Sequence, residues 1–582
     1  MLHLKYLNKF LWKYRNLLII GTLFITISNV FALYPAEFVR KAFDSVLLNM
    51  QDNTKPTSEI RYTLLKYGSL IVIFAILKGL FMFFMRQTVI VMSRKIEFDL
   101  KNEIYQQYQK LSMSFYKKNQ TGDLMNRISE DVSRVRMYLG PGLMYAINIS
   151  ILFYLVISRM LGISHTLTLY VLLPLPILAI LVYLVSSNIN KQSERVQNQL
   201  SEITTISQET FSAIKIIKSF RNEKNTWKVF TDACKSYTNK QIKLVKIEAF
   251  FFPVIVTMIG MSTIITIYIG GIETFKGNIT TGNIAEFIIY VNMLAWPVAS
   301  VGWITSIVQR AAASQERIND FLLLKSEIQN NTNNTTPISG DIHFNNVSLT
   351  YSDTDITALK DVTFTIKEGS SIGIFGETGS GKSTIANLLC RLYETSRGDI
   401  IYGETNIQDL NLFNLRSSIG YIPQDGYLFS GSIKENIAFG SSTTNMKEII
   451  NAAEKAQILG EINSFNNRFE TVIGERGVKL SGGQRQRLSI ARTFYKKPEI
   501  FVFDDCLSAI DAKKEQDILK KLKNESRGKT SIIISHRITT IKDSNYIIVL
   551  KRGTIIEKGS HQELLKNKGF YYKMYKRQSR SV

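Results

Sequence analysis

The residues best suited to chemistry form a glycine-rich run between a β-branched stretch, Ser371 to Phe375, and a helix that starts near Thr384. The run reads Gly376, Glu377, Thr378, Gly379, Ser380, Gly381, Lys382 and Ser383. Its glycines let successive backbone amides face an anion, and the helix start adds positive potential. We expect Lys382 to reach the β and γ phosphates of a nucleotide and Ser383 to coordinate Mg²⁺. The strand–loop–helix order disfavours a chance glycine-rich turn.

A second chemical feature is a pair of carboxylates that follows the apolar stretch Ile500 to Phe503. The carboxyl end of a parallel strand lies beside a phosphate-binding loop, where a carboxylate can hold Mg²⁺. We therefore assign Asp504 to the metal and expect Asp505 to face the γ-phosphate and an attacking water. Helix capping is the alternative, because Ser508 and Asp511 follow, but the preceding apolar strand disfavours it.

The elements that come before these motifs are apolar and long. Five stretches without Asp, Glu, Lys or Arg, and a sixth interrupted only by Lys78 and Arg86, each reach the roughly 20 residues that cross a bilayer as helix. Buried helices of a soluble protein are the alternative, but six such stretches exceed what globular cores use. We predict six transmembrane helices, at about residues 16–36, 67–93, 137–158, 165–188, 249–272 and 287–309.

The distribution of basic residues predicts the orientation of these helices. Lys and Arg number 71 against 48 Asp and Glu. They gather before the first span and in the long connections after the second and fourth, and are sparse in the short connections after the third and fifth. We therefore place both termini and the long connections in the cytoplasm of a multi-pass cell (inner) membrane protein. The net charge of +23 is then a topology signal and an attraction to anionic lipid and nucleotide phosphate, and no nucleic-acid partner is expected.

The long connections have apolar residues at near-helical spacing, so we expect their helices to continue beyond the membrane. Two interpretations of Lys78 and Arg86 stay open: they reach the membrane surface or a structural partner, or they line a cavity for anionic amphiphiles. The neighbouring residues Phe81 to Met85 are either lipid-facing packing or part of an adaptable drug pocket.

Composition changes after Arg317. Residues 326–340 are rich in Asn, Thr and turn-forming residues and are predicted to be a linker. Short β-branched runs then alternate with helical stretches, which predicts an α/β domain at 341–582 after an all-α membrane domain at 1–325. The chain's Cys residues, Cys234, Cys390 and Cys506, lack metal-ligand spacing and are predicted to be small apolar packing residues.

A third motif makes the sequence recognisable. Leu480, Ser481, Gly482, Gly483 and Gln484, followed by Arg485, Gln486 and Arg487, resemble the signature of ATP-binding cassette (ABC) proteins. With six spans followed by one phosphate-loop domain, nearly the whole chain resembles a half-size ABC exporter of the multidrug or lipid type. The resemblance implies ATP and Mg²⁺ as ligands, a P-loop NTPase cassette, and ATP hydrolysis coupled to transport.

The resemblance also implies roles for further residues. Tyr351 would stack on adenine, Gln424 would link Mg²⁺ to the membrane domain, and His536 would be the switch histidine. Residues Gly474 to Gly477 would form an exporter-specific loop, and Asp511 would belong to the D-loop. Two cassettes in this family close head to tail, so Leu480 to Gln484 would complete an ATP site on a second half-transporter. Coupling regions are expected at about 116–127 and 209–220.

One position departs from the family pattern, which usually has Glu where this chain has Asp505. The side chain is shorter by about 1.5 Å, and positional errors near 1 Å cost about a hundredfold in rate. The substitution resembles heterodimeric exporters in which one chain has a weakened Walker B carboxylate but an intact signature. We therefore favour a heterodimer, with a homodimer as the alternative.

The expected function is ATP-driven efflux of an amphipathic small molecule, drug or lipid by alternating access. The alternatives are a homodimeric exporter or lipid flippase, and an ATP-gated channel or sensor, because the motifs specify ATP-driven closure rather than pumping. A soluble nucleic-acid ATPase with the same motifs is disfavoured by the six spans. An importer is disfavoured because spans and cassette share one chain.

Overall fold

The structure is a computed structural model that describes residues 2–52, 57–332, 338–441, 444–474, 480–507 and 512–579. They form two compact units. The membrane unit holds Met1–Gln107 and Gly122–Leu323, and the cassette unit holds Tyr108–Thr121 and Leu324–Val582. A short segment from the N-terminal half of the chain is therefore part of the second unit.

Among the described residues of the membrane unit, six helices or helical runs are long and apolar enough to cross a membrane, which confirms the predicted number. In chain order they are α2 (Arg15–Asp52), α3 (Thr57–Lys110), the run from α5 to α7 (Thr121–Ile163), α8 with α9 (His165–Leu172 and Pro174–Ser212), α11 (Glu223–Phe275) and α12 (Thr281–Leu322). Two short elements, η1 (Leu2–Leu7) and α1 (Asn8–Lys13), come before them.

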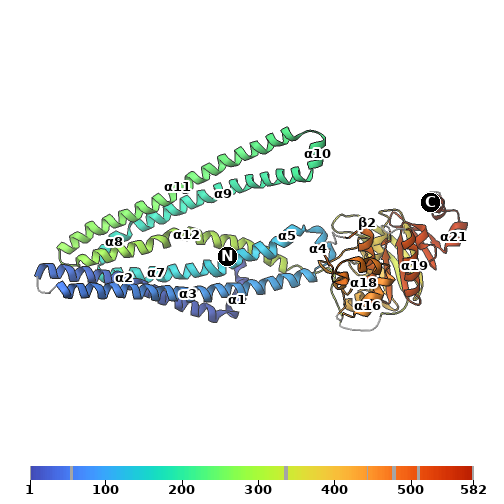
Figure 1. The fold of residues 1–582 in the computed structure, drawn as a ribbon, viewed down its shortest axis with the longest axis horizontal. Helices are drawn as coiled ribbons and strands as arrows, with labels where there is room; N and C mark the ends of the chain where they lie inside the picture. The colour runs from blue at the N-terminus through green and yellow to red at the C-terminus, as the bar shows by residue number, and fades with distance from the viewer. Residues whose placement is uncertain are drawn as a thin grey trace. The chain divides into compact units, whose positions relative to one another are not determined.

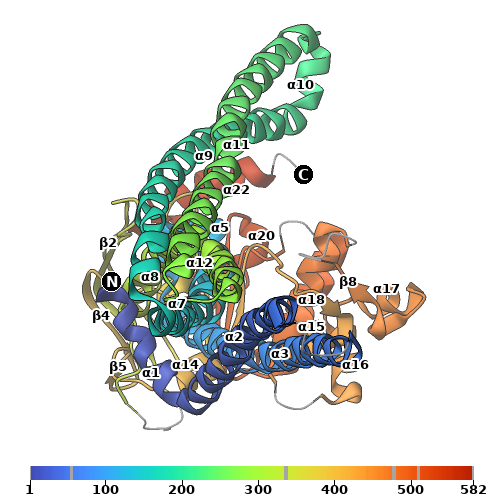
Figure 2. The same cartoon turned by 90° about the vertical axis from the view of Figure 1, so that its left-hand side faces the viewer.

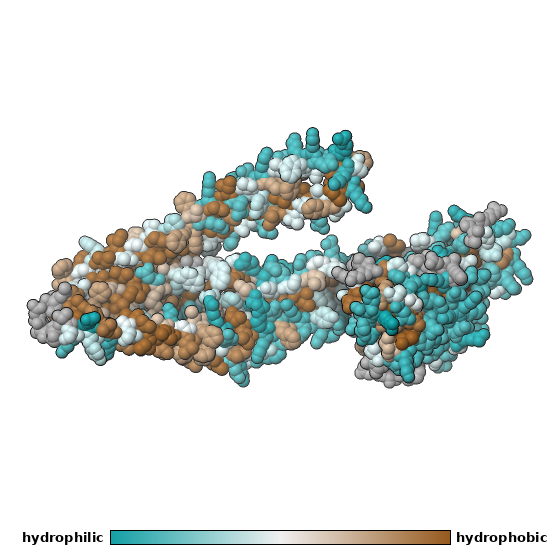
Figure 3. Space-filling model, in the orientation of Figure 1, coloured by the Kyte–Doolittle hydropathy of each residue, from teal (hydrophilic) through white to brown (hydrophobic). Residues whose placement is uncertain are grey.

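The helices extend beyond the predicted spans, as expected for the long connections. The second span was predicted to end near residue 93, but α3 continues to Lys110, and α9 continues from a predicted end near 188 to Ser212. A helix can do this because its backbone bonds are internal and do not depend on the surrounding medium. Figure 3 shows the corresponding change along α9 and α11, from hydrophobic surface to polar surface towards α10 (Ile214–Ser219).

The third membrane run is the least regular. It consists of α5 (Thr121–Asn126), η2 (Arg127–Asp131), α6 (Val132–Met137), η3 (Tyr138–Gly142) and α7 (Leu143–Ile163). The elements η2 and η3 are π-helical turns, and η3 contains Pro141. Proline lacks the amide hydrogen that the helical ladder needs, so a local change of helical pitch at this point is expected.

The helices α9 and α11 form a hairpin that α10 closes. Gln199 accepts hydrogen bonds from Ser236 (3.1 Å) and Lys240 (2.6 Å), which ties the two polar halves together. In Figures 1 and 2 the α10 end of this hairpin points away from α2, α7 and α12. Its side chains there include exposed apolar groups, among them Phe211, Phe220 and Trp227.

In the part of the cassette unit that the structure describes, the strands form three sheets. A four-stranded antiparallel sheet has the order β2-β1-β4-β5, a six-stranded sheet has the order β12-β11-β3-β10-β9-β6, and β7 pairs with β8. In the large sheet β11, β3, β10, β9 and β6 run parallel, and β12 is antiparallel. The strands are β1 (Ile342–Thr350), β2 (Thr357–Ile366), β3 (Ser371–Gly376), β4 (Arg397–Tyr402), β5 (Thr405–Asn406), β6 (Ile419–Ile422), β7 (Gly431–Ser432), β8 (Val472–Ile473), β9 (Ile500–Asp504), β10 (Thr530–Ser535), β11 (Tyr546–Lys551) and β12 (Thr554–Gly559).

The helices of the cassette unit complete its layers. They are α4 (Met113–Lys118), α13 (Lys382–Leu389), α14 (Leu412–Ser418), α15 (Ile433–Ile437), α16 (Met446–Lys455), α17 (Leu459–Ser464), η4 (Arg468–Glu470), α18 (Gly482–Lys496), α19 (Ala512–Glu525), α20 (Ile538–Ile541), α21 (His561–Lys566) and α22 (Phe570–Ser579). The predicted fold class, an all-α membrane region followed by an α/β cassette, is confirmed.

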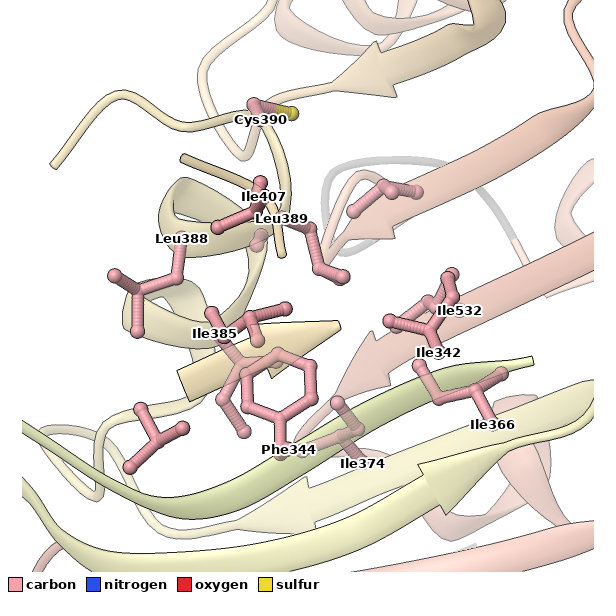
Figure 4. Packing of buried hydrophobic residues seen from close by; sticks show 14 of the residues in the cluster. Ile342, Phe344, Ile366, Ile374, Ile385, Leu388, Leu389, Cys390, Ile407 and Ile532 are labelled. Atoms are coloured by element: carbon pink, nitrogen blue, oxygen red, sulfur yellow. The ribbon is translucent and has the colours of Figure 1, made fainter. Parts of the chain in front are cut away.

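The core of the cassette lies between its two larger sheets and α13. Phe344 of β1, Ile374 of β3 and Ile385 of α13 are all fully buried in this cluster (Figure 4). Removal of such side chains from water is the main force that fixes the start of α13 against β3. Cys234 is only half-buried, whereas Cys390 and Cys506 are buried, as predicted, and burial raises the pKa of both buried thiols, that of Cys390 to about 12. Neither thiol is therefore primed for reaction.

Candidate nucleotide-binding site

One cavity of about 650 Å³ in the cassette unit collects most of the residues that the sequence predicts for an ATP site. The predicted residues that line it are Tyr351, Thr378, Gly379, Gly381, Lys382, Ser383, Thr384, Gln424, Asp504, Asp505 and His536. Sheet topology brings them together, because the loops after β3, β9 and β10 leave neighbouring parallel strands at the same edge. The cavity is therefore built from segments more than 150 residues apart in the chain.

The glycine-rich loop has the backbone shape that the sequence requires. Gly379 and Gly381 have φ values of +78° and +98°, in the region that favours glycine. A Cβ at Gly381 would lie 2.4 Å from the carbonyl oxygen of Ala358, so no larger residue fits there without a shift. The loop thus curls tightly ahead of α13, whose first turn contains Lys382 and Ser383.

Lys382 is held inside this loop. Its Nζ donates to the carbonyl oxygens of Gly376 and Glu377, both at 2.8 Å. Burial lowers the pKa of the amine, while Asp505 and Asp504 partly oppose that shift. An amine that gains from nearby negative charge suits a polyphosphate ligand, whose oxygens would replace the carbonyl contacts.

Asp504 and Ser383 form the pair of oxygen groups that Mg²⁺ would need. The Ser383 hydroxyl donates to Oδ1 of Asp504 at 2.9 Å, and the Tyr421 hydroxyl approaches Oδ2 at 3.3 Å. Asp504 is 2% exposed, and burial raises its pKa against the hydrogen bonds from Ser383 and Tyr421. A buried carboxylate of this kind gains strongly from a neighbouring cation.

The donor set fits Mg²⁺ better than a metal caged by protein alone. Within the part of the chain that the structure describes, no group of three or more His, Cys, Asp or Glu could hold a metal ion. Mg²⁺ keeps several waters and is commonly bound through one or two protein oxygens plus substrate phosphates. Ser383 and Asp504 match that pattern. Tyr421 was not assigned from the sequence, although it stands three residues before Gln424.

Asp505 and His536 face each other across the cavity edge. His536 Nδ1 lies 2.9 Å from Oδ1 and 2.8 Å from Oδ2 of Asp505. Asp505 has φ +46°, a left-handed conformation that Asp tolerates better than most residues. The backbone turn after β9 and the imidazole therefore both fix this carboxylate. The sequence named the two residues separately and did not pair them.

The aromatic end of the cavity contains residues that the sequence did not single out. The hydroxyls of Tyr351 and Thr384 lie 3.0 Å apart, and the Tyr351 and Tyr393 rings meet edge to face with centroids 5.0 Å apart. Lys117, from the segment Tyr108–Thr121, lines the same cavity. Sequence reasoning assigned neither Tyr393 nor Lys117 to this site. A lone Tyr, or a lone Lys in a basic connection, belongs to no recognisable motif.

The signature residues lie at the start of α18. Ser481 is its N-cap and exchanges hydrogen bonds with Gln484: the Ser481 amide donates to the Gln484 side chain, and the Gln484 amide donates to the Ser481 hydroxyl. This capping box orients the helix start. Leu480, Ser481, Gly482, Gly483 and Gln484 are not among the residues that line the cavity. The chain therefore does not bring its own signature and phosphate loop together.

A polar cluster holds α18 in place. Glu461 of α17 pairs with Arg487 at 2.9 Å and with Lys514 of α19 at 2.8 Å. Burial alone would raise the pKa of Glu461, but the hydrogen bonds from Arg487 and Lys514 outweigh it and lower the pKa to about 2. Glu461 thus ties the helix after the signature to the helix that follows β9.

Two predicted elements cannot be placed. Asp511 of the D-loop lies outside the described residues, and so do residues 475–477 of the exporter-specific loop, of which only Gly474 is described.

Comparison with known proteins agrees with this architecture. Residues 18–298 match the ABC transporter transmembrane region, and residues 359–508 match the ABC transporter family. The probable multidrug resistance ABC transporter ATP-binding/permease protein YheI of Bacillus subtilis is 36% identical over 474 residues, or 80% of each chain. The multidrug resistance-like ATP-binding protein MdlA of Escherichia coli is 32% identical over 517 residues, or 88% of each chain.

The same fold is found in a solved structure. A bacterial Atm1-family ABC exporter with ATP bound superposes with a TM-score of 0.80, covers 97% of this chain and 98% of its own, and is 24% identical. The matches to both regions, the extent of the relatives and the assembled nucleotide cavity lead to one conclusion. The chain belongs to the ABC transporter family, as a multi-pass membrane protein whose transmembrane region is joined to an ATP-hydrolysing ABC domain.

Proposed function

We propose that the chain is one half of an exporter that uses ATP to move amphipathic small molecules, drugs or lipids out of the cytoplasm by alternating access. One observation carries this proposal: the cavity with Lys382 and Asp504 lacks the signature residues Leu480 to Gln484. A complete site then needs a second cassette, and closure of two cassettes on ATP is a step that can drive a conformational change. The names of the relatives support the multidrug class of substrate.

Exposed surfaces of the membrane unit support a dimer. Only 6% of the apolar window of α3 and 11% of that of α11 are buried, against 47% for α12. Lipid can cover part of this surface, but Phe211, Phe220 and Trp227 lie on the polar end of the α9–α11 hairpin, beyond the predicted span. Large apolar groups exposed outside lipid are typical of contact surfaces. Residues 209–220 are therefore our candidate contact with the second half-transporter, and 116–127 our candidate contact with the cassette.

We assign the ligand roles from the residues that line the cavity. Lys382 and the glycine-rich loop bind the phosphates, Ser383, Asp504 and Gln424 hold Mg²⁺, and Tyr351 stacks on adenine. Mg²⁺ supplies charge neutralisation at the β and γ phosphates. Asp505 orients the attacking water, and His536 keeps the carboxylate in position. Ser481 and the amides at the start of α18 of this chain complete the γ-phosphate site of the second cassette. Asp511 contributes to that site from the D-loop.

A heterodimer fits the shortened carboxylate at position 505. His536 binds both oxygens of Asp505, so the carboxylate is directed at the imidazole and is about 1.5 Å shorter in reach than Glu. Hydrolysis at this site is then slow, and the intact signature serves the site of a partner that carries Glu. Both termini and the cassette lie in the cytoplasm, where the basic connections favour the anionic inner leaflet.

ATP turnover separates the heterodimer from the homodimer. The chain is purified alone and together with a second half-transporter, and hydrolysis is compared with that of the Asp505→Asn variant. We expect slow turnover alone and faster turnover in the mixed complex. Robust turnover by the chain alone, abolished by Asp505→Asn, would instead establish the homodimer.

Transport itself requires a separate experiment. The protein is reconstituted into sealed liposomes that are preloaded with a fluorescent amphiphile, so that further transport must run against the gradient of this amphiphile. Uphill, ATP-dependent movement supports an exporter. If the amphiphile only flows down its gradient after ATP addition, the protein is a channel and not an exporter. If only a labelled phospholipid is moved, the protein is a flippase.

A further inference from the structure

The aromatic end of the nucleotide cavity already contains a cation. The Nζ atom of Lys117 lies 4.7 Å from the ring centroid of Tyr351 and 5.3 Å from that of Tyr393. Both distances are within the roughly 6 Å over which a cation and an aromatic ring attract. Lys117 and Tyr351 both line the cavity. The amine thus lies over the Tyr351 ring at the edge of this cavity.

We infer that Lys117 occupies the base subsite, the space beside the Tyr351 ring, and that a purine must displace it in order to stack. The inference rests on the proposed role of Tyr351 in stacking. A stacked base lies about 3.5 Å from the ring face, in contact with it. An ammonium group 4.7 Å from the centroid is close enough to the ring to obstruct a base stacked on that face. Lys117 and the base therefore compete for one aromatic face.

The segment that carries Lys117 is anchored to the cassette. Lys117 lies in the last turn of α4, and the Ser114 hydroxyl of the same helix donates to Glu327 at 2.5 Å. The Ser112 and Ser114 hydroxyls lie 2.8 Å apart, which fixes the start of α4. The amine also stays charged: burial lowers the pKa of Lys117, but Tyr393, Tyr351 and Asp353 outweigh this and raise it above its usual value.

The position of this segment in the chain gives the contact a consequence. Tyr108–Thr121 joins α3 directly to the third membrane run, which begins at Thr121. Displacement of Lys117 removes one of the contacts that hold this connection on the cassette. Coupling between two binding events is reciprocal. If the contact between Lys117 and Tyr351 weakens ATP binding by a given factor, bound ATP weakens that contact by the same factor. The base of ATP, rather than its phosphates, thus releases Lys117.

Binding measurements on the full chain in lipid nanodiscs test this competition. Lys117→Met keeps the length of the side chain and removes its charge, and Lys118→Met is the matched control, because Lys118 is also exposed and lies in the same turn. The dissociation constants of ATP and of inorganic tripolyphosphate are measured for each. Cation–π attraction of this kind corresponds to roughly 2- to 30-fold in binding.

We expect Lys117→Met to tighten ATP binding by roughly 2- to 30-fold, with tripolyphosphate binding unchanged and Lys118→Met like the unaltered protein. Weaker or unchanged ATP binding in Lys117→Met would overturn the inference, and so would an equal change for tripolyphosphate. Hydrogen exchange in residues 108–121 gives a second measurement. It should rise with ATP and not with tripolyphosphate, and an equal rise with both would count against the competition.

A Tyr351→Ala variant separates this inference from the proposed function. If Tyr351 stacks on the base, Tyr351→Ala weakens ATP binding, and adding Lys117→Met then changes nothing further. If Tyr351→Ala leaves ATP binding unchanged, the stacking role itself is wrong. If Tyr351→Ala weakens ATP binding but Lys117→Met alone does not tighten it, stacking stands and only the competition fails.

Discussion

The phosphate-loop half and the signature half of the nucleotide site differ in how complete they are within one chain. In the phosphate-loop half, Lys382 donates to the loop's own carbonyl oxygens, Ser383 donates to Asp504, and all three residues line one cavity. In the signature half, Ser481 and Gln484 are capped and oriented, but they do not line that cavity. The first half can hold a ligand within one chain, and in our proposal the second is presented to a partner. Substitutions in the two halves should therefore fail in different ways.

The largest effect is expected from Lys382→Ala. The substitution removes the amine that would meet the phosphates, and the loss of one such preorganised charge costs about 10²- to 10³-fold in rate. Nucleotide binding to the chain alone should weaken as well, since the phosphate-loop half acts without a partner. Equilibrium binding of ATP and turnover in the assembled transporter measure the two effects. Unchanged binding by a folded variant would contradict the assignment of this cavity.

Ser481→Arg should break the signature half alone. A bulky cation at the start of α18 would obstruct the partner's γ-phosphate site, while ATP binding by the isolated chain stays as it was. We expect turnover of the assembled transporter to fall by about 100-fold, comparable with loss of an anion-stabilising donor. ATP binding by the single chain and ATP turnover by the assembled transporter are both measured to check this prediction. A loss of ATP affinity in the single chain would place Ser481 in the chain's own site.

Asp505→Glu should strengthen the phosphate-loop half. The carboxylate gains about 1.5 Å of reach, and corrections of about 1 Å are worth up to about a hundredfold in rate. We expect the purified chain to hydrolyse ATP about 10- to 100-fold faster, with little change in ATP affinity. Asp505→Asn serves as the inactive reference. If Asp505→Glu is no faster than the unaltered chain, the length of the side chain does not limit hydrolysis.

The smallest effect concerns the support of the signature half. The pKa of Glu461 is lowered to about 2, so the charged carboxylate stabilises the fold above its usual pKa of about 4.5. That contribution should be lost as pH falls from about 4.5 to about 2. Because the side chain is 28% exposed, we expect only about 1 kcal/mol at neutral pH, or about 2 to 4 °C in Tm.

Thermal unfolding of Glu461→Gln against the unaltered protein at pH 7 and at pH 3 measures this contribution. The difference in Tm should shrink at the lower pH, because protonation of Glu461 in the unfolded chain removes the charge contribution of the unaltered protein, while the Gln variant has no charge at this position to lose. A difference that stays constant over this range would show that packing, and not charge, accounts for the effect of Glu461.

The membrane helices could be read from local properties of the chain. The number of spans followed from charge-free stretches, because lipid excludes charge and requires the backbone to satisfy its own hydrogen bonds. The bounds were less accurate: α3 continues to Lys110, well past residue 93. A polar amphipathic helix and a membrane span have the same backbone conformation. Hydropathy therefore predicts where the membrane-embedded segment ends, and not where the helix ends.

The site was predictable where a motif carries its own geometry. The glycine-rich loop is one contiguous segment, and its residues need special backbone conformations that the sequence reveals through Gly379 and Gly381. Tyr393 and Lys117 were missed, because each is a common residue type in an ordinary local setting. Only their approach to Tyr351 gives them a possible role.

The sequence by itself determined the family resemblance, the order of membrane and cassette regions, and which residues are candidates for binding phosphate and Mg²⁺. These features depend on residue type and on short spacing, both of which can be read directly from the sequence. The tertiary structure alone decided that His536 binds Asp505, that Lys117 reaches the nucleotide cavity, and that the signature residues lie outside it. The physical reason is that parallel strands and packed helices bring together segments hundreds of residues apart, and no local pattern records which side chains will meet.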